Sequence, residues 1–171
     1  MRRQRACGLC LSLNNEQEIE MKDSLKALII VTFMLLPLAA SAADGMITLK
    51  SSHGVSATVD KLESLLKEKG MTVFNRISHS DGAAGVGLAL RPTELVIFGN
   101  PKVGTPLMQC AQSVAIDLPQ KALIWEDEAG QVWLGYNDPM YLKSRHDIEG
   151  CEAVLEKIKG ALGSFAEAAT R

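Results

Sequence analysis

The segment between residues 121 and 136 constrains the fold more than any other part of this sequence. Residues 121–126 and 131–136 are rich in aliphatic and aromatic side chains, and they flank the turn sequence Asp127-Glu128-Ala129-Gly130. Two strand-forming runs on either side of a short turn that ends in glycine predict an antiparallel β-hairpin. A sheet has to bury its apolar face, so we expect helices to cover this one.

Further strands are predicted upstream of the hairpin. Residues 46–50 alternate between apolar and polar side chains, and residues 71–78 and 93–98 are also rich in strand-forming residues. These patterns predict three more strands. We expect strand 71–78 to pair with strand 46–50, because a helix connects the two.

Helix signals lie between and after these strands. Ser56 or Thr58 is placed to cap the first helix, and Gly70 is placed to end it in a left-handed conformation. Thr105 followed by Pro106 predicts an N-cap and a first helical residue. The other expected elements are a helix through about residue 118, helices at 139–146 and about 149–168, and a short helix or loose crossover at 81–90.

This order of elements predicts an α+β fold with two layers. Helices are expected on one face of a mainly antiparallel sheet. Residues 43–171 are numerous enough to bury a core without metal or disulfide staples, and we expect them to form a single domain.

Residues 21–42 have the three parts of a secretory signal. The charged stretch 21–26 precedes the apolar stretch 27–40, and Ala40-Ser41-Ala42 suits signal peptidase, so we expect cleavage after Ala42. The alternative is a retained membrane anchor. Residues 1–20, with Cys7 and Cys10, precede this complete signal, and we interpret them as an extension from an upstream start codon. The mature protein is therefore expected to be periplasmic or secreted.

The charge of the mature chain excludes one class of partner. Cleavage after Ala42 leaves 129 residues with 13 basic and 16 acidic side chains, a formal charge of −3. Proteins that bind nucleic acid usually carry a concentrated positive surface. We expect no nucleic-acid partner, and no membrane partner once the signal is removed.

One long segment resembles a known family. Leu90-Arg-Pro-Thr-Glu-Leu-Val-Ile-Phe-Gly-Asn-Pro-Lys-Val-Gly-Thr-Pro-Leu-Met108 resembles the bacterial domain-of-unknown-function 302 (DUF302) family, and the resemblance extends from about Ile47 to Ile158. Further matching segments are Asp117-Leu-Pro, Ala122-Leu-Ile-Trp-Glu-Asp127 and Tyr136-Asn-Asp-Pro139. The resemblance implies a compact α+β domain of the TBP-like type that forms homodimers. It implies no activity, substrate or catalytic residue.

Residues 98–106, Phe-Gly-Asn-Pro-Lys-Val-Gly-Thr-Pro, are called the signature segment below. Free backbone N–H groups at a turn before a helix hold anions, and Lys102 would add a positive charge beside Thr105. The segment lacks the lysine of a phosphate-binding P-loop, which excludes nucleotide hydrolysis of that type. Two readings stay open: a contact site for a small anion or small molecule, and a rigid turn with an N-cap.

Three more residues are candidates for ligand contacts. His79, Tyr136 and His146 lie at the ends of predicted elements, where sites often gather. The alternative for both histidines is a hydrogen-bonded structural role. The histidines lack the spacing of a preassembled zinc or copper site, so no metal is predicted. Trp125 and Trp133 are expected in the core or at a subunit interface, and the acidic residues 126–128 at a solvated turn.

Cys110 and Cys151 are the cysteines of the expected mature chain. In an exported protein they could form a disulfide bond. The alternatives are an inert pair of thiols, with Cys110 buried on a helix stripe, and a redox or metal site.

Two function classes follow from these residues. The first is an exported homodimeric domain that binds a small ligand or a partner, with a site near residues 99–105. The second is a periplasmic redox or metal-dependent accessory enzyme that uses Cys110, Cys151, His79 and His146. No catalytic motif decides whether the chain is an enzyme, and no cofactor is identified.

Overall fold

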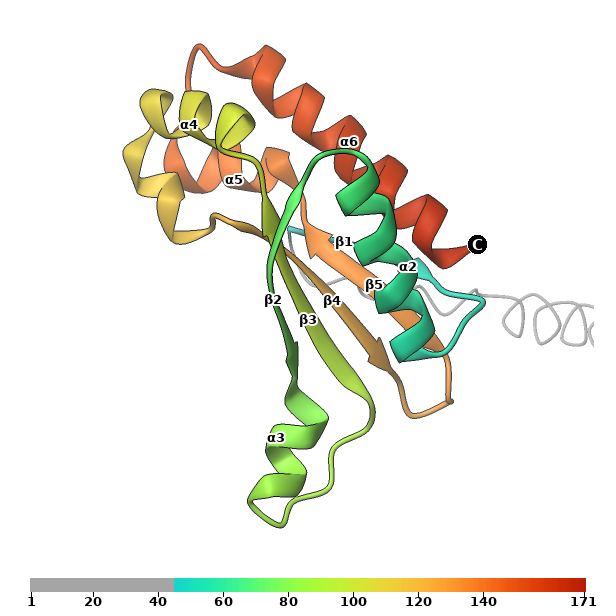
Figure 1. Ribbon diagram of the computed structural model, residues 1–171. Coiled ribbons are helices and arrows are strands. Elements are labelled where there is room, and N and C mark those ends of the chain that lie inside the picture. The colour runs from blue at the N-terminus through green and yellow to red at the C-terminus, as the bar shows by residue number, and fades with distance from the viewer. Residues whose placement is uncertain (1–44) are drawn as a thin grey trace, which may run out of the picture. The chain divides into compact units, whose positions relative to one another are not determined.

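The computed structural model describes residues 45–171. The predicted signal, its cleavage site and the Cys7/Cys10 pair lie outside the described residues. Five strands form one antiparallel sheet in the order β1-β5-β4-β3-β2 (Figure 1). They are β1 (Met46–Lys50), β2 (Thr72–Ser78), β3 (Thr93–Gly99), β4 (Gln120–Glu126) and β5 (Val132–Asn137).

The predicted pairing of strand 46–50 with strand 71–78 is wrong, because β1 and β2 lie at opposite edges of the sheet. Strands β3, β4 and β5 pair in chain order and occupy the centre. The two edge positions of the sheet are therefore left for β1, which pairs with β5, and for β2, which pairs with β3. The helix α2 (Val55–Glu68) therefore crosses the sheet instead of joining neighbouring strands.

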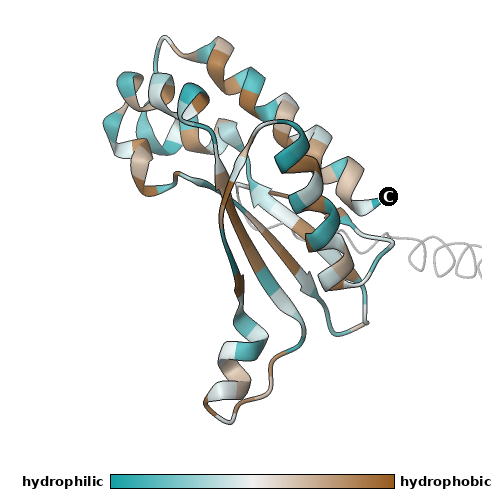
Figure 2. Cartoon of the chain, in the orientation of Figure 1, coloured by the Kyte–Doolittle hydropathy of each residue, from teal (hydrophilic) through white to brown (hydrophobic). Residues whose placement is uncertain are grey.

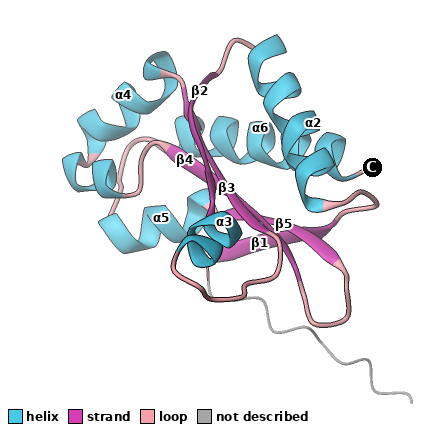
Figure 3. Cartoon of the chain, turned by 60° about the horizontal axis from the view of Figure 1, so that its bottom comes forward, coloured by secondary structure: helices cyan, strands magenta, loops and turns pink. Residues whose placement is uncertain are grey.

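Helices α2 and α6 (Glu152–Thr170) pack against each other over one face of the sheet (Figure 3). Their buried leucine, isoleucine and valine side chains meet those of the sheet, whose central strands are strongly hydrophobic (Figure 2). The largest fully buried side chains include Phe98, Leu62, Leu66, Ile124, Leu134 and Leu155. The α+β architecture with helices on one face of an antiparallel sheet is thus confirmed.

The start of α2 differs from the prediction, whereas its end agrees. Gly54 is the N-cap, and Thr58 lies inside the helix with its hydroxyl donating to the Gly54 carbonyl at 2.9 Å. The helix begins early enough to bury Val55, which is 6% exposed. Gly70 follows the helix with φ +71°, the left-handed stop that its position predicted.

The predicted hairpin is present, and Asp127 organises its turn. One carboxylate oxygen of Asp127 accepts hydrogen bonds from the N–H groups of Ala129 and Gln131, each at 2.9 Å. The other accepts from the indole N–H of Trp133 at 2.7 Å. These donors, above all the indole, lower the pKa of Asp127. The acidic turn is therefore more than a solvated tip, because one of its carboxylates holds the turn together.

The two tryptophans stack on the face of the sheet opposite α2 and α6. Trp125 and Trp133 are register partners on β4 and β5, with ring centroids 6.5 Å apart. Gly135 leaves room for this arrangement, since a Cβ there would lie 3.0 Å from the Trp125 ring and 3.2 Å from the Met46 sulfur.

We expect Gly135→Ala to displace the Trp125 ring and to lower the free energy of unfolding by about 1 kcal/mol, because the added methyl overpacks the site. The near-ultraviolet circular dichroism of the tryptophan pair should change while the far-ultraviolet spectrum stays the same. Gly160→Ala is the control, since its Cβ would meet nothing within 4 Å. An unchanged tryptophan signal in Gly135→Ala would contradict the packing described here.

The connection between β2 and β3 forms an arm that extends away from the other helices (Figure 1). It contains the short helix α3 (His79–Gly85), which starts two residues before the predicted range. Beyond α3, the side chains of Val86, Leu88 and Leu90 are 73%, 67% and 50% exposed. We refer to residues 79–92 as the arm.

The remaining helices are α4 (Pro101–Cys110), the 3₁₀ helix η1 (Gln112–Ile116) and α5 (Pro139–His146). Helix α5 matches its predicted range, and Asp138 caps it by accepting a hydrogen bond from the N–H of Met140 at 2.9 Å. Helices α4 and α5 both contact α6, and η1 contacts α4 and α5.

Candidate functional site

Most of the signature segment is the start of a helix, so the predicted cap at Thr105 is wrong. Asn100 is the N-cap of α4, and Pro101 takes the first helical position that the sequence analysis assigned to Pro106. Asn100-Pro101 and Thr105-Pro106 each combine a capping residue with a proline, and the helix starts at the first of these dipeptides. Pro106 lies inside α4, which ends at Cys110 instead of near residue 118.

The structure removes the basis for an anion site at the signature segment. The Asn100 side chain accepts a hydrogen bond from the N–H of Lys102 at 2.9 Å, and the N–H groups of Val103 and Gly104 donate to the Asn100 carbonyl. The backbone donors expected to face an anion are thus used within the helix. Lys102 is an exposed residue of the first turn.

A cavity of about 300 Å³ lies between α4, α6 and one end of the sheet. Residues 99–101 and 103–105 of the signature segment line one side of it. The start of β2 contributes Phe74, and α6 contributes Ile158, Leu162 and Phe165. Of the five predicted ligand contacts, Thr105 is the one that lines this cavity.

The cavity wall is apolar except at a few positions. The buried residues of its lining are Ile158, Leu162 and Gln120, which are 6%, 4% and 8% exposed, and they are called the floor below. At the rim, Thr105 and Lys157 are exposed. Among the described residues that line the cavity, Lys157 is the one charged side chain, so no carboxylate faces a ligand there.

Gln120 is the buried polar residue of the cavity lining, and the sequence did not predict it as a site residue. Its amide makes no hydrogen bond to a described side chain or backbone group, although the residue is more than nine-tenths buried. No fully enclosed polar side-chain atom in residues 45–171 lacks a partner, so this amide keeps some exposure, and Gln120 is one of the residues that line the cavity. A glutamine directly before the predicted strand 121–126 carried no signal of this role.

A β-bulge brings Phe74 to the cavity. The register between β2 and β3 shifts between Val73 and Asn75, which leaves Phe74 as the extra residue. Phe74 is 54% exposed, and a Cβ on Gly99 would lie 3.3 Å from its ring. Gly99 of the signature segment therefore makes room for the Phe74 ring at the cavity wall.

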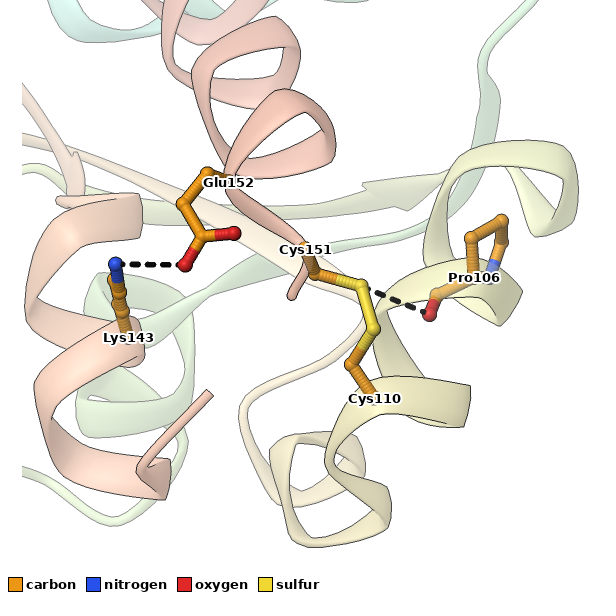
Figure 4. The surroundings of a disulfide bond; sticks show 5 residues. All are labelled: Pro106, Cys110, Lys143, Cys151 and Glu152. Atoms are coloured by element: carbon orange, nitrogen blue, oxygen red, sulfur yellow. Dashed lines mark hydrogen bonds and ion pairs between the residues drawn. A yellow bond between two sulfur atoms is a disulfide. The ribbon is translucent and has the colours of Figure 1, made fainter. Parts of the chain in front are cut away.

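A disulfide bond joins Cys110 to Cys151 (Figure 4). Cys110 is the last residue of α4 and Cys151 is the N-cap of α6, with their Cα atoms 6.4 Å apart. Lys143 of α5 forms an ion pair with Glu152 at 3.1 Å beside the bond (Figure 4). The disulfide therefore ties together the two helices that line the cavity. Cys110 is exposed, which does not agree with the alternative of an inert thiol buried on a helix stripe.

His146 takes part in a cluster between α5 and the segment around η1. Its Nε2 lies 2.6 Å from Asp117 Oδ2, and its Nδ1 lies 3.1 Å from the Ser113 hydroxyl. Arg145 also pairs with Asp117, at 3.3 Å. None of these residues lines the cavity, and the cluster cross-links α5 to the chain that follows α4, as the structural alternative for this histidine anticipated.

The other two candidates lie elsewhere. His79 is exposed at the start of α3, in the arm. Tyr136 is 5% exposed on the helix-covered face of β5, and burial raises the pKa of its hydroxyl. The structure thus distributes His79, Tyr136 and His146 over three elements outside the cavity.

Residues 45–171 contain neither a cluster of metal-ligating side chains nor a membrane-length apolar helix. No three His, Cys, Asp or Glu side chains in this range gather closely enough to hold a metal ion. No helix in it is both long and apolar enough to cross a membrane.

Sequence comparison finds relatives that are longer than this chain. A protein of Brucella suis biovar 1 named "Fluoride-specific ion channel FluC 1" is 46% identical over 112 residues, which is 66% of this chain and 44% of that protein. The protein of the same name from Brucella abortus biovar 1 is also 46% identical, over 42% of its length. The chain thus matches less than half the length of these relatives.

Structural and family comparisons agree with the fold. The crystal structure of an uncharacterized conserved DUF302 protein from Bacillus stearothermophilus superimposes with a TM-score of 0.68 and 22% identity, covering 75% of this chain and 100% of that one. The family model described as "Domain of unknown function DUF302" matches residues 47–165. The chain therefore belongs to the DUF302 family.

Proposed function

We propose that this protein binds a small, largely apolar molecule in the cavity between α4 and α6. The observation that carries the proposal is a cavity of about 300 Å³ whose wall is apolar and is lined by the signature segment. Small-molecule sites are usually apolar concavities with a few polar groups, and their volumes begin at roughly 300 Å³. An apolar molecule gains affinity here by leaving water.

The proposal is tested by filling the cavity. Ala161 is an exposed residue of α6 that lines it, so Ala161→Trp should occupy part of the space. With cumene as the probe, we expect backbone amide NMR shifts in α4 and α6 of the wild type and at least tenfold weaker binding to Ala161→Trp.

Ala153→Trp is the matched control, since Ala153 is also exposed on α6 but does not line the cavity. It should bind cumene like the wild type. Equal binding to all three proteins, or no cumene-dependent shifts in the wild type, would contradict the proposal.

The second part of the proposal is a homodimer that uses the open face of the sheet. The half-buried side chains of Ile77, Leu95, Ile97, Leu123 and Trp125 alternate along their strands with residues that face α2 and α6. The arm adds Val86, Leu88 and Leu90, which are at least half exposed and find no cover within their own domain. A twofold axis would bring the same face and arm of a second copy against them.

Light scattering on the purified protein should give the mass of a dimer. Ile97→Lys places a charge on the open face and should shift the mass toward the monomer, whereas Ala153→Lys on the exposed side of α6 should not. A wild-type protein that is monomeric at all measured concentrations would contradict the dimer.

Export is the third part, and it rests on the signal pattern of residues 21–42. The protein recovered from the periplasm or medium of its host should have the intact mass of residues 43–171, with Ala43 at its N-terminus. Protein that is found in the cytosol and whose intact mass still includes residues 21–42 would contradict export.

The Brucella relatives favour one other candidate, a role beside a fluoride channel, because these longer proteins are named as fluoride-specific ion channels. If this chain acts with such a channel, deleting it should sensitise the host to fluoride. We do not propose a redox or metal-dependent enzyme. Cys110 and Cys151 form a disulfide bond, and His79 and His146 lie on separate elements.

A further inference from the structure

We infer that the ligand is uncharged and carries a carboxamide-like group, with a hydrogen-bond donor and an acceptor side by side, which pairs with the Gln120 amide at the cavity floor. This inference rests on the proposed function and specifies its ligand. Gln120 lines the cavity and is 8% exposed, and its amide has no hydrogen-bond partner among the described residues and is not fully enclosed.

The surroundings of Gln120 explain why a polar group is required there. The other two buried residues that line the cavity, Ile158 and Leu162, offer no polar side-chain atom. Water can solvate the amide while the cavity is open, but an apolar ligand that displaces this water leaves the amide buried and unpaired, which is costly. A purely hydrocarbon ligand therefore binds against a penalty that a ligand with a matching polar group avoids.

The charge and size of the ligand follow from the same lining. A glutamine amide presents one C=O acceptor and an NH₂ donor, so a carboxamide or lactam complements both. A carboxylate at the floor would lose its hydration beside a neutral amide, and the positive charge of Lys157 lies at the exposed rim. At roughly 30 Å³ for each water-sized group, a cavity of about 300 Å³ holds about ten non-hydrogen atoms.

Three probes separate these features. Benzamide carries the matching group, cumene has the same branched shape without polar atoms, and benzoate has the same shape with a negative charge. Their dissociation constants are measured by NMR titration of the full-length wild-type protein and of Gln120→Met, which keeps the length of the side chain but removes the amide.

We expect Gln120→Met to weaken the binding of benzamide, relative to the binding of cumene, by about tenfold, because the amide group of benzamide then lacks its partner. Wild-type protein should bind benzamide more tightly than benzoate. Cumene binding to the variant shows that its cavity has formed. If Gln120→Met does not fold, Gln120→Asn is the second variant, because it withdraws the amide by one methylene. It should change the ratio of the benzamide and cumene dissociation constants in the same direction.

The outcomes distinguish the inference from the proposed function. One outcome is that benzamide and cumene both bind at the cavity with a ratio of dissociation constants that stays the same when the Gln120 amide is removed or withdrawn. In that case the inference is wrong and the proposed function stands. Tighter binding of benzoate than of benzamide also overturns the inference. If none of the probes binds at the cavity, the proposed function fails and the inference fails with it.

Discussion

Replacing both cysteines by serine, in Cys110→Ser/Cys151→Ser, should lower the free energy of unfolding by about 3 to 4 kcal/mol. The bond closes a loop between residues 41 positions apart, and a loop of that length restricts the unfolded chain by about 4 kcal/mol in the chain-entropy model. The loop includes β4, β5 and α5. Urea unfolding monitored by circular dichroism measures the difference.

The disulfide prediction has an internal control. A reducing agent should destabilise the wild type by a similar amount and leave the double variant unchanged. Because the bond connects the end of α4 to the start of α6, the variant should also bind the cavity probe more weakly. A loss of less than about 1 kcal/mol would mean that the bond contributes little beyond the packing of these two helices.

The second large effect concerns two phenylalanines that lie on paired strands. Phe98 is 1% exposed on the helix-covered face of β3, whereas Phe74 is 54% exposed in the bulge of β2. Phe98→Ala should lower the free energy of unfolding by about 3 to 5 kcal/mol, because it leaves a cavity in the core. Phe74→Ala should cost less than about 1 kcal/mol but should weaken cumene binding, because its ring lines the cavity.

Measuring both properties for both variants separates packing from binding. Thermal unfolding reports the effect on stability, and NMR titration at a temperature where both variants are folded reports the effect on affinity. A large loss of stability in Phe74→Ala, or unchanged affinity, would show that the exposed ring supports the fold and does not serve the cavity.

The signature segment combines these roles in a few residues. Phe98 fills the core, Gly99 makes room for the Phe74 ring, and Asn100 starts α4. The Asn100 amide also donates to the Gly70 carbonyl at 3.2 Å, which ties α4 to the turn after α2. The segment thus places α4 against the end of the sheet and creates one wall of the cavity.

Local signals predicted the elements that depend on neighbouring residues. The hairpin turn, the left-handed Gly70 and the range of helix α5 each follow from side chains within a few positions of one another. The resemblance identified the family over most of the described chain.

Competition between similar local signals could not be decided from the sequence. Asn100-Pro101 and Thr105-Pro106 are both good helix starts, and in the structure the helix begins at Asn100, whose side chain also contacts the Gly70 turn. Likewise, β1 and β2 are joined by a helix as pairing strands often are, but the central position of β3, β4 and β5 separates them.

The sequence by itself determined which residues form strands, turns and most helices, because hydrophobic periodicity and capping act over one or two turns of chain. Only the tertiary structure decided which strands are neighbours and that Gln120, Thr105 and Lys157 line one cavity, since these residues come from segments distant in sequence. It also placed His146 beside Asp117, away from that cavity. The physical reason is that a binding site depends on long-range packing, which local patterns do not encode.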